Sequence, residues 1–90
     1  MQDIRKKLQL SLAKIVKDLR LSTHKSVSLI SNEVNLSKSI WSDLEKGIKD
    51  PQLSTLWRVA EALDIPLSRL IMLLEDATDG KINFIEDSSK

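Results

Sequence analysis

The chain of 90 residues has no cysteine and no tyrosine, and only two glycines, two tryptophans, one phenylalanine and one histidine. Without cysteine, a disulfide framework is excluded. Two glycines are too few for a glycine-rich phosphate loop, and one histidine without cysteine makes no metal-ligand cluster. So few aromatic residues argue against a platform that stacks the bases of single strands. No nucleophile stands paired with a base, so we expect no catalytic activity, no metal and no cofactor.

Long apolar runs are also missing. The longest run covers residues 70–74, far short of the roughly 20 residues that a membrane-spanning helix needs. No pattern of a signal peptide is present. Ninety residues suit one domain with a small helical core, and we expect a cytoplasmic protein.

The charges are unevenly distributed along the chain. Residues 1–25 carry seven Lys/Arg against two Asp/Glu, whereas residues 71–90 carry two against five. A basic first helix beside an acidic C-terminus favours attraction of the first helix to phosphates, with the tail turned away. The alternative is that these lysines only solvate the outer face of that helix.

Residues 26–47 have the pattern of two short helices joined by a sharp turn. Ser26 and Ser37 can each cap a helix through a side-chain oxygen. Asn35 lies between the helices and tolerates a left-handed conformation, and Gly47 ends the second helix. The apolar positions that each helix would bury are Ile30 and Val34, then Trp41 and Leu44.

Other helices are predicted on both sides of this segment. An apolar stripe from Leu8 predicts a helix that ends near Arg20, and residues 53–63 predict another, stopped by a left-handed Asp64. Pro66 opens a fifth helix through about Glu75. A loop at 76–80 follows, and residues 81–86 form a short strand or an ordered tail.

Landmarks at a characteristic spacing run through residues 8–74. They are Leu19-Arg20, Leu36-Ser37, Glu45-Lys46-Gly47, Pro51, Leu56 to Leu63 as Leu-Trp-Arg-Val-Ala-Glu-Ala-Leu, Ile65-Pro66-Leu67, and Leu70. In this order they resemble the lambda-repressor-like, Cro-type helix-turn-helix family, also called the XRE family. The resemblance implies an all-α domain of five helices over residues 1–75, with a C-terminal tail at 76–90 that is a candidate dimerisation segment. It also implies a homodimeric regulator of transcription, a repressor in our interpretation, that binds double-stranded DNA.

The same resemblance assigns base contacts to the second helix of the motif. By position they fall to Lys38, Ser39 and Asp43, with Ser42 assisting. Lys38 suits guanine O6 and N7, and a carboxylate at Asp43 can accept from cytosine N4 but also faces phosphates. We expect phosphate contacts from Lys7, Lys14, Lys17, Ser26, Lys46 and Lys49.

Three positions depart from the family pattern. Val27 stands where the family usually has a glutamine that touches DNA, and Ile40 stands where it tends to have a small polar residue. Asp43 replaces the usual polar or basic residue. These departures keep an alternative open, a protein-interaction module on the same fold, antitoxin-like or antirepressor-like.

Structural roles are also implied by the family. Arg20 and Glu45 match a pair that commonly forms a salt bridge between the first and third helices. The alternative is that both are ordinary solvated charges. Trp41 and Gly47 are expected to hold the third helix. His24 falls at a glycine position, where we expect a left-handed turn residue.

The fifth helix has more apolar residues than one buried stripe needs, which indicates burial against a second surface. We predict a dimer interface formed by Leu70, Met72, Leu73, Ile82 and Phe84. In the alternative, Met72 and Trp57 complete a monomer core beneath Ile82 and Phe84. A solvated acidic tail is the remaining alternative for residues 76–90.

Overall fold

The computed structural model describes the backbone of residues 2–85 and the side chains of residues 4–85. This part of the chain forms five helices and no strand, so the predicted all-α fold is confirmed. None of these helices is long and apolar enough to cross a membrane. The helices are α1 (Gln2–Thr23), α2 (Val27–Glu33), α3 (Lys38–Lys46), α4 (Leu53–Ala62) and α5 (Leu67–Thr78).

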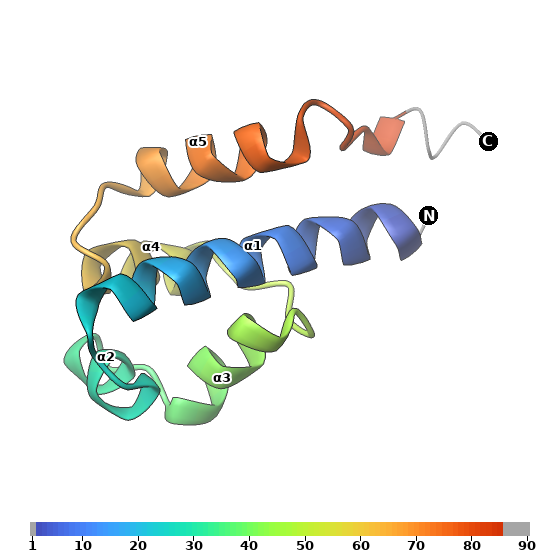
Figure 1. The fold of residues 1–90 in the computed structure, drawn as a ribbon. Coiled ribbons are helices and arrows are strands. Elements are labelled where there is room, and N and C mark those ends of the chain that lie inside the picture. The colour runs from blue at the N-terminus through green and yellow to red at the C-terminus, as the bar shows by residue number, and fades with distance from the viewer. Residues whose placement is uncertain (1, 86–90) are drawn as a thin grey trace.

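The longest helix, α1, organises the fold (Figure 1). It lies between α5 on one side and α3 on the other, and its amino-terminal end projects beyond α3. α2 contacts α3 and α4, and α4 contacts α5. All five helices contribute to one core, whose buried members are Leu12, Val16, Ile30, Trp41, Leu44, Val59, Ala60, Leu63 and Leu70.

α1 is longer at both ends than the apolar stripe predicts. At its start, the half-buried Ile4 extends the stripe by one turn before Leu8. At its end, the hydroxyls of Ser22 and Thr23 donate to the carbonyls three residues earlier, at 2.6 Å each. These bonds satisfy carbonyls that a helix end leaves without partners, so the helix continues through Thr23.

The turns predicted to be left-handed are confirmed. His24, Asn35 and Asp64 have φ angles of 63°, 58° and 60°. Positive φ is uncommon outside glycine, and asparagine, aspartate and histidine are the residue types enriched there. Each follows a helix directly or within two residues, so these residues set where α1, α2 and α4 stop.

The predicted end of the last helix near Glu75 is wrong by about one turn. The hydroxyl of the buried Thr78 donates to the carbonyls of Leu74 and Glu75, at 3.1 and 3.0 Å, and so continues α5. Asp79, with φ 50°, ends it.

The strand considered for residues 81–86 is absent from the described part, up to residue 85. The amide of Lys81 instead closes a turn on the carbonyl of Thr78, at 2.9 Å. Ile82 is half-buried and lines a cleft of about 280 Å³ with Leu8 and Leu74. The last part of the predicted tail, residues 86–90, lies outside the described residues.

Candidate nucleic-acid interface

The amino-terminal ends of α2 and α3 lie beside one shared cleft. Both predicted caps are confirmed: the hydroxyl oxygen of Ser26 accepts from the amide of Leu29, and that of Ser37 accepts from the amide of Ile40, at 3.1 Å each. The cleft has a volume of about 560 Å³. Its lining residues are Ser26, Ser28, Leu29, Ser31, Asn32, Leu36, Ser37 and Lys38.

The outer face of α3 carries the predicted base-contacting side chains. Ser39, Ser42, Asp43 and Lys46 recur at three, one and three residues, so they share one face of the helix. Ser39 and Lys46 are exposed, and Ser42 and Asp43 are half-exposed. The exposed Lys38 lies at the edge of this face and lines the cleft with α2. The structure thus gathers all four predicted base-contacting residues on one surface.

The departures from the family pattern have different structural consequences. Val27 is half-buried and packs against the core, so its side chain is not free to contact a ligand. Ile40 is 39% exposed and lies on the flank of α3, where it lines a cleft of about 360 Å³ with the α3–α4 loop. Only Asp43 stands on the outer face itself.

A hydrogen-bonded network fixes α3 beneath α1. The predicted Arg20–Glu45 pair is confirmed: the two side chains meet through two hydrogen bonds, 2.5 Å from Nε to Oε2 and 3.0 Å from Nη2 to Oε1. Arg20 Nη1 also donates to the carbonyl of Lys25, at 2.9 Å, and the indole Nε1 of Trp41 donates to Glu45, at 2.7 Å. These hydrogen bonds therefore join α1, α3 and the loop before α2.

The network is sheltered from water, with exposures of 12% for the side chain of Arg20 and 9% for that of Glu45. The hydrogen bonds to Glu45 raise the pKa of Arg20, with desolvation acting the other way and the charge of Glu45 adding to the rise. Arg20 therefore keeps its charge throughout the physiological pH range. A sheltered two-bond pair of this kind gives α3 a fixed orientation.

The end of α3 is held by α1 as well. Gly47 has φ 73°, as expected for the residue that ends a helix. A Cβ at Gly47 would lie 2.7 Å from Leu10 Cδ2, so α1 passes close to this turn. Lys6 Nζ donates to the carbonyl of Gly47, at 3.3 Å, and Arg5 Nε lies 3.5 Å from Asp50 Oδ2.

Like the Lys6–Gly47 bond, a contact between α4 and the turn before α3 was not predicted from the sequence. Arg58 of α4 donates to the carbonyl of Asn35, at 3.2 Å, and so supports the turn between α2 and α3. This bond spans 23 residues and the Lys6–Gly47 bond spans 41. Helical periodicity relates residues a few positions apart, so it contains no signal for either contact.

The structure sorts the basic residues of α1 into two faces. At about 100° per residue, Lys6 and Lys17 lie within about 20° of each other, and the bond from Lys6 Nζ to the carbonyl of Gly47 shows that Lys6 is turned to α3. Lys7 and Lys14 lie about 80–100° from Lys6 around the helix. The Nζ of Lys14 lies 3.3 Å from a carboxylate oxygen of Asp18. Lys46 and Lys49 are exposed at the end of α3.

The predicted dimer residues are also divided. Leu70 has 0% exposure within the single chain. It belongs to the core and is not available to a second subunit, so its assignment to an interface is wrong. Met72 and Phe84 remain 49% and 45% exposed, while Leu73 is half-buried. The alternative of a monomer core completed by Met72 and Trp57 is wrong too, because Trp57 is 56% exposed.

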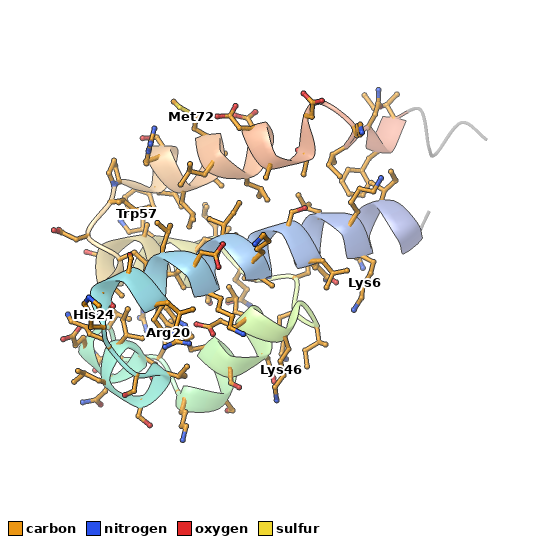
Figure 2. The ribbon with its side chains drawn as sticks, in the orientation of Figure 1. Lys6, Arg20, His24, Lys46, Trp57 and Met72 are labelled. Atoms are coloured by element: carbon orange, nitrogen blue, oxygen red, sulfur yellow. The ribbon has the colours of Figure 1, made fainter. Side chains whose placement is uncertain are left out.

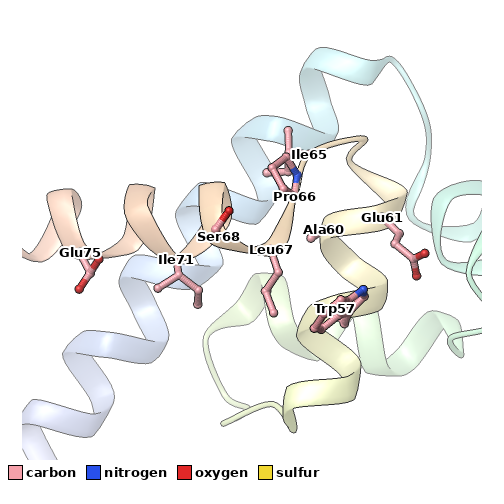
Figure 3. Close-up of a pocket in the computed structure, with 9 residues that line it drawn as sticks. All are labelled: Trp57, Ala60, Glu61, Ile65, Pro66, Leu67, Ser68, Ile71 and Glu75. Carbon is pink, nitrogen blue, oxygen red and sulfur yellow. The ribbon is translucent and has the colours of Figure 1, made fainter.

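Trp57 instead borders an apolar groove between α4 and α5 (Figure 3). In the close-up, Trp57 of α4 lies across from Leu67 and Ile71 of α5. The groove has a volume of about 720 Å³, and Glu61 and Glu75 are among its lining residues.

Comparisons with known proteins agree with this geometry. The HTH-type transcriptional regulator SutR of Escherichia coli (strain K12) is 30% identical over 67 residues, which are 74% of this chain and 38% of SutR. A crystal structure of an HTH_3 family transcriptional regulator from Vibrio cholerae is similar with a TM-score of 0.69 at 25% identity, and the match covers 76% of this chain and 38% of that one. The chain thus spans well under half the length of both relatives.

The family model HTH_3, helix-turn-helix, matches residues 16–70, which is more than half of the chain. The capped helices α2 and α3 and their left-handed turn lie inside the matched range. The chain therefore belongs to the HTH_3 family of helix-turn-helix proteins, of the XRE type.

Proposed function

We propose that this protein binds double-stranded DNA sequence-specifically and regulates transcription as a repressor. The observation that carries the proposal is the outer face of α3. It is exposed and polar, and the Arg20–Glu45–Trp41 network holds it in place beneath α1. An α-helix fits the major groove of B-DNA, where polar side chains can read base edges. Family membership supports the same function.

In this proposal each side chain of α3 makes the DNA contact that suits its chemistry. Lys38 donates to guanine, Ser39 and Ser42 bond base edges or phosphates, and Asp43 accepts from cytosine N4. Direct phosphate contacts come from Ser26, Lys17, Lys46 and Lys49. Lys7 and Lys14, on the other face of α1, add attraction over a longer range that fades beyond a Debye length.

The proposed active form is a homodimer. Met72, Leu73, Ile82 and Phe84 remain candidates for its interface, and the groove beside Trp57 joins them, because Trp57 is the most exposed aromatic residue among those described. A two-fold dimer presents two recognition helices about one helical turn of DNA, or 34 Å, apart. The proposed operator is therefore a pseudo-palindrome.

Selection from a random pool of duplexes tests the proposal. We expect one enriched sequence with two related half-sites. Lys38→Ala should weaken binding to it by about 1–3 kcal/mol and relax the preference at one base pair. Lys46→Ala is the matched control, since loss of a phosphate contact should weaken all duplexes alike. A pool without enrichment, or an unchanged preference in Lys38→Ala, contradicts the proposal.

A protein-interaction module is the second candidate. Two observations favour it: the half-exposed Ile40 on the flank of α3, and the apolar groove beside Trp57. Binding to duplex DNA over a series of salt concentrations separates the two candidates. Phosphate contacts make affinity fall steeply with salt, whereas a module that binds only protein shows no such duplex binding.

A further inference from the structure

Three lysines from two distant parts of the chain meet at the carboxyl-terminal end of α3. Lys46 and Lys49 come from α3 and the loop after it, and Lys6 comes from the second turn of α1. The bond from Lys6 Nζ to the carbonyl of Gly47 places Lys6 beside them. In Figure 2, Lys6 and Lys46 project toward the same side of the molecule. We name Lys6, Lys46 and Lys49 the lysine cluster.

We infer that the lysine cluster contacts neighbouring phosphates of the DNA backbone at the wall of the major groove, and that Lys6, supplied by α1, contacts a phosphate that Lys46 and Lys49 do not reach. This inference rests on the proposed function and names a further residue of the same interface. Lys6 lies outside the matched family range of residues 16–70. The contact would thus be a property of this chain's own α1.

The charge balance of the cluster supports an anionic ligand. All three lysines are exposed, and among the side chains that the structure describes, none has a carboxylate oxygen within ion-pair distance. Arg5 is different, because Asp50 lies 3.5 Å from it and offsets its charge. The partner of Lys6 is a neutral carbonyl at 3.3 Å, which leaves the ammonium charge and its other donors available.

The lengths of the helices place the cluster within reach of the backbone. With a rise of about 1.5 Å per residue, α1 extends about 33 Å and α3 only about 13 Å. Since α1 crosses α3 and continues past Gly47, its first turns overhang the end of α3 (Figure 1). The major groove is about 12 Å wide and 8.5 Å deep, so phosphates rise along the flanks of any helix that enters it. Lys6 would meet such a phosphate.

The neighbouring lysine provides a matched control. Lys6 and Lys7 carry the same charge and are both exposed. They lie about 100° apart around α1, and only Lys6 shares the face turned to α3. A direct phosphate contact therefore predicts different effects for the two residues, whereas general attraction predicts equal ones.

The test is the salt dependence of binding to a fixed duplex, measured by fluorescence anisotropy. Each phosphate contact contributes about 0.9 to the slope of log K against log salt. We expect Lys6→Met to lower this slope by about 0.9, which is roughly an eightfold loss of affinity at 0.1 M salt. Lys6→Arg should retain the slope, and Lys7→Met should lower it by less than half as much. Lys6→Gln removes the charge but keeps a donor for the carbonyl of Gly47, so it should behave as Lys6→Met does.

A purely structural role for Lys6 would change thermal stability without changing the salt slope. An unchanged slope in Lys6→Met and Lys6→Gln, or a change equal to that of Lys7→Met, overturns the inference while leaving the proposed function intact. A wild-type protein that binds no duplex overturns the proposed function, and this inference with it.

Replacing single phosphates of the selected duplex by uncharged methylphosphonates locates the contact. We expect one position at which neutralisation weakens the wild type but not Lys6→Met. If every position weakens both proteins equally, Lys6 contacts no phosphate and the inference fails.

Discussion

The corner where α1 meets α3 and the face formed by α4 and α5 differ in how completely one chain covers them. At the corner, the guanidinium of Arg20, the carboxylate of Glu45 and the indole of Trp41 all have partners within the chain. On the other face, Trp57 is 56% exposed beside the apolar groove, and Leu53, 67% exposed, lines a second cleft that also includes Trp57. The first region is covered within one chain, and the second leaves apolar side chains exposed.

This difference separates two requirements of the proposed function. A helix that reads base edges must keep its orientation, and sheltered polar bonds fix orientation because leaving any member unpaired is costly. An interface with another molecule needs apolar surface that its own chain leaves uncovered. Substitutions in the corner should therefore act on folding, and substitutions on the α4–α5 face should act on association.

The largest effect is expected for Glu45→Ala. It leaves the sheltered guanidinium of Arg20 without its carboxylate and the indole of Trp41 without an acceptor. Breaking such a pair costs about 3–5 kcal/mol, and urea denaturation should show this loss in the free energy of unfolding. Glu45→Gln keeps an acceptor and should lose less. A cost below about 1 kcal/mol for Glu45→Ala would mean that the pair behaves as a surface salt bridge.

A pair of substitutions in α5 sharpens the boundary between core and surface. Leu70 is fully buried, and Leu70→Ala should lower the free energy of unfolding by about 3 kcal/mol through lost burial and a cavity. Met72, two residues along and 49% exposed, should lose well under half as much when replaced by alanine. Thermal unfolding of both variants checks this. Equal losses would contradict the assignment of Leu70 to the core and Met72 to the surface.

A smaller effect is expected for Gly47→Ala at the end of α3. Its φ of 73° disfavours any side chain, at a cost of about 1–2 kcal/mol. The new Cβ would also meet Leu10 Cδ2 at 2.7 Å, although this methyl group belongs to a half-exposed side chain that can move. Differential scanning calorimetry should show a lower melting temperature. Gly80→Ala is the control, because φ there is also positive but no atom lies within 4 Å of the added Cβ.

The sequence predicted the corner well and the other face poorly. Ser26, Ser37, Asn35 and Gly47 act within a few residues of their own helix ends, and local chemistry is visible in a sequence. The Arg20–Glu45 pair spans 25 residues, and only the family resemblance indicated it. The periodicity of α5 showed more apolar residues than one buried stripe needs, but it offered no way to tell which of them the other helices cover, so the buried Leu70 was assigned to an interface.

Contacts between distant segments were the part that sequence reasoning missed. Lys6 reaches Gly47 because α1 begins before its predicted apolar stripe, where the half-buried Ile4 adds a turn. The exposure of Trp57 likewise depends on where α5 crosses α4. The Lys6–Gly47 contact and the exposure of Trp57 are both set by the packing of helices against each other, which the sequence of a single helix does not determine.

The smallest effect on stability and the largest on association are expected for Trp57→Ser. Because the side chain is 56% exposed, its loss should change the free energy of unfolding, measured at low protein concentration, by no more than about 0.5 kcal/mol. A tryptophan at the centre of an interface commonly contributes 2 kcal/mol or more to binding, or about thirtyfold in Kd. Sedimentation of the variant should therefore show a dimer weakened by at least about tenfold. Leu21→Ser, a similarly exposed apolar residue on α1, should leave the dimer unchanged. If Trp57→Ser dimerises as the wild type does, the second copy does not cover the groove, and the interface must be sought at Met72 and Phe84.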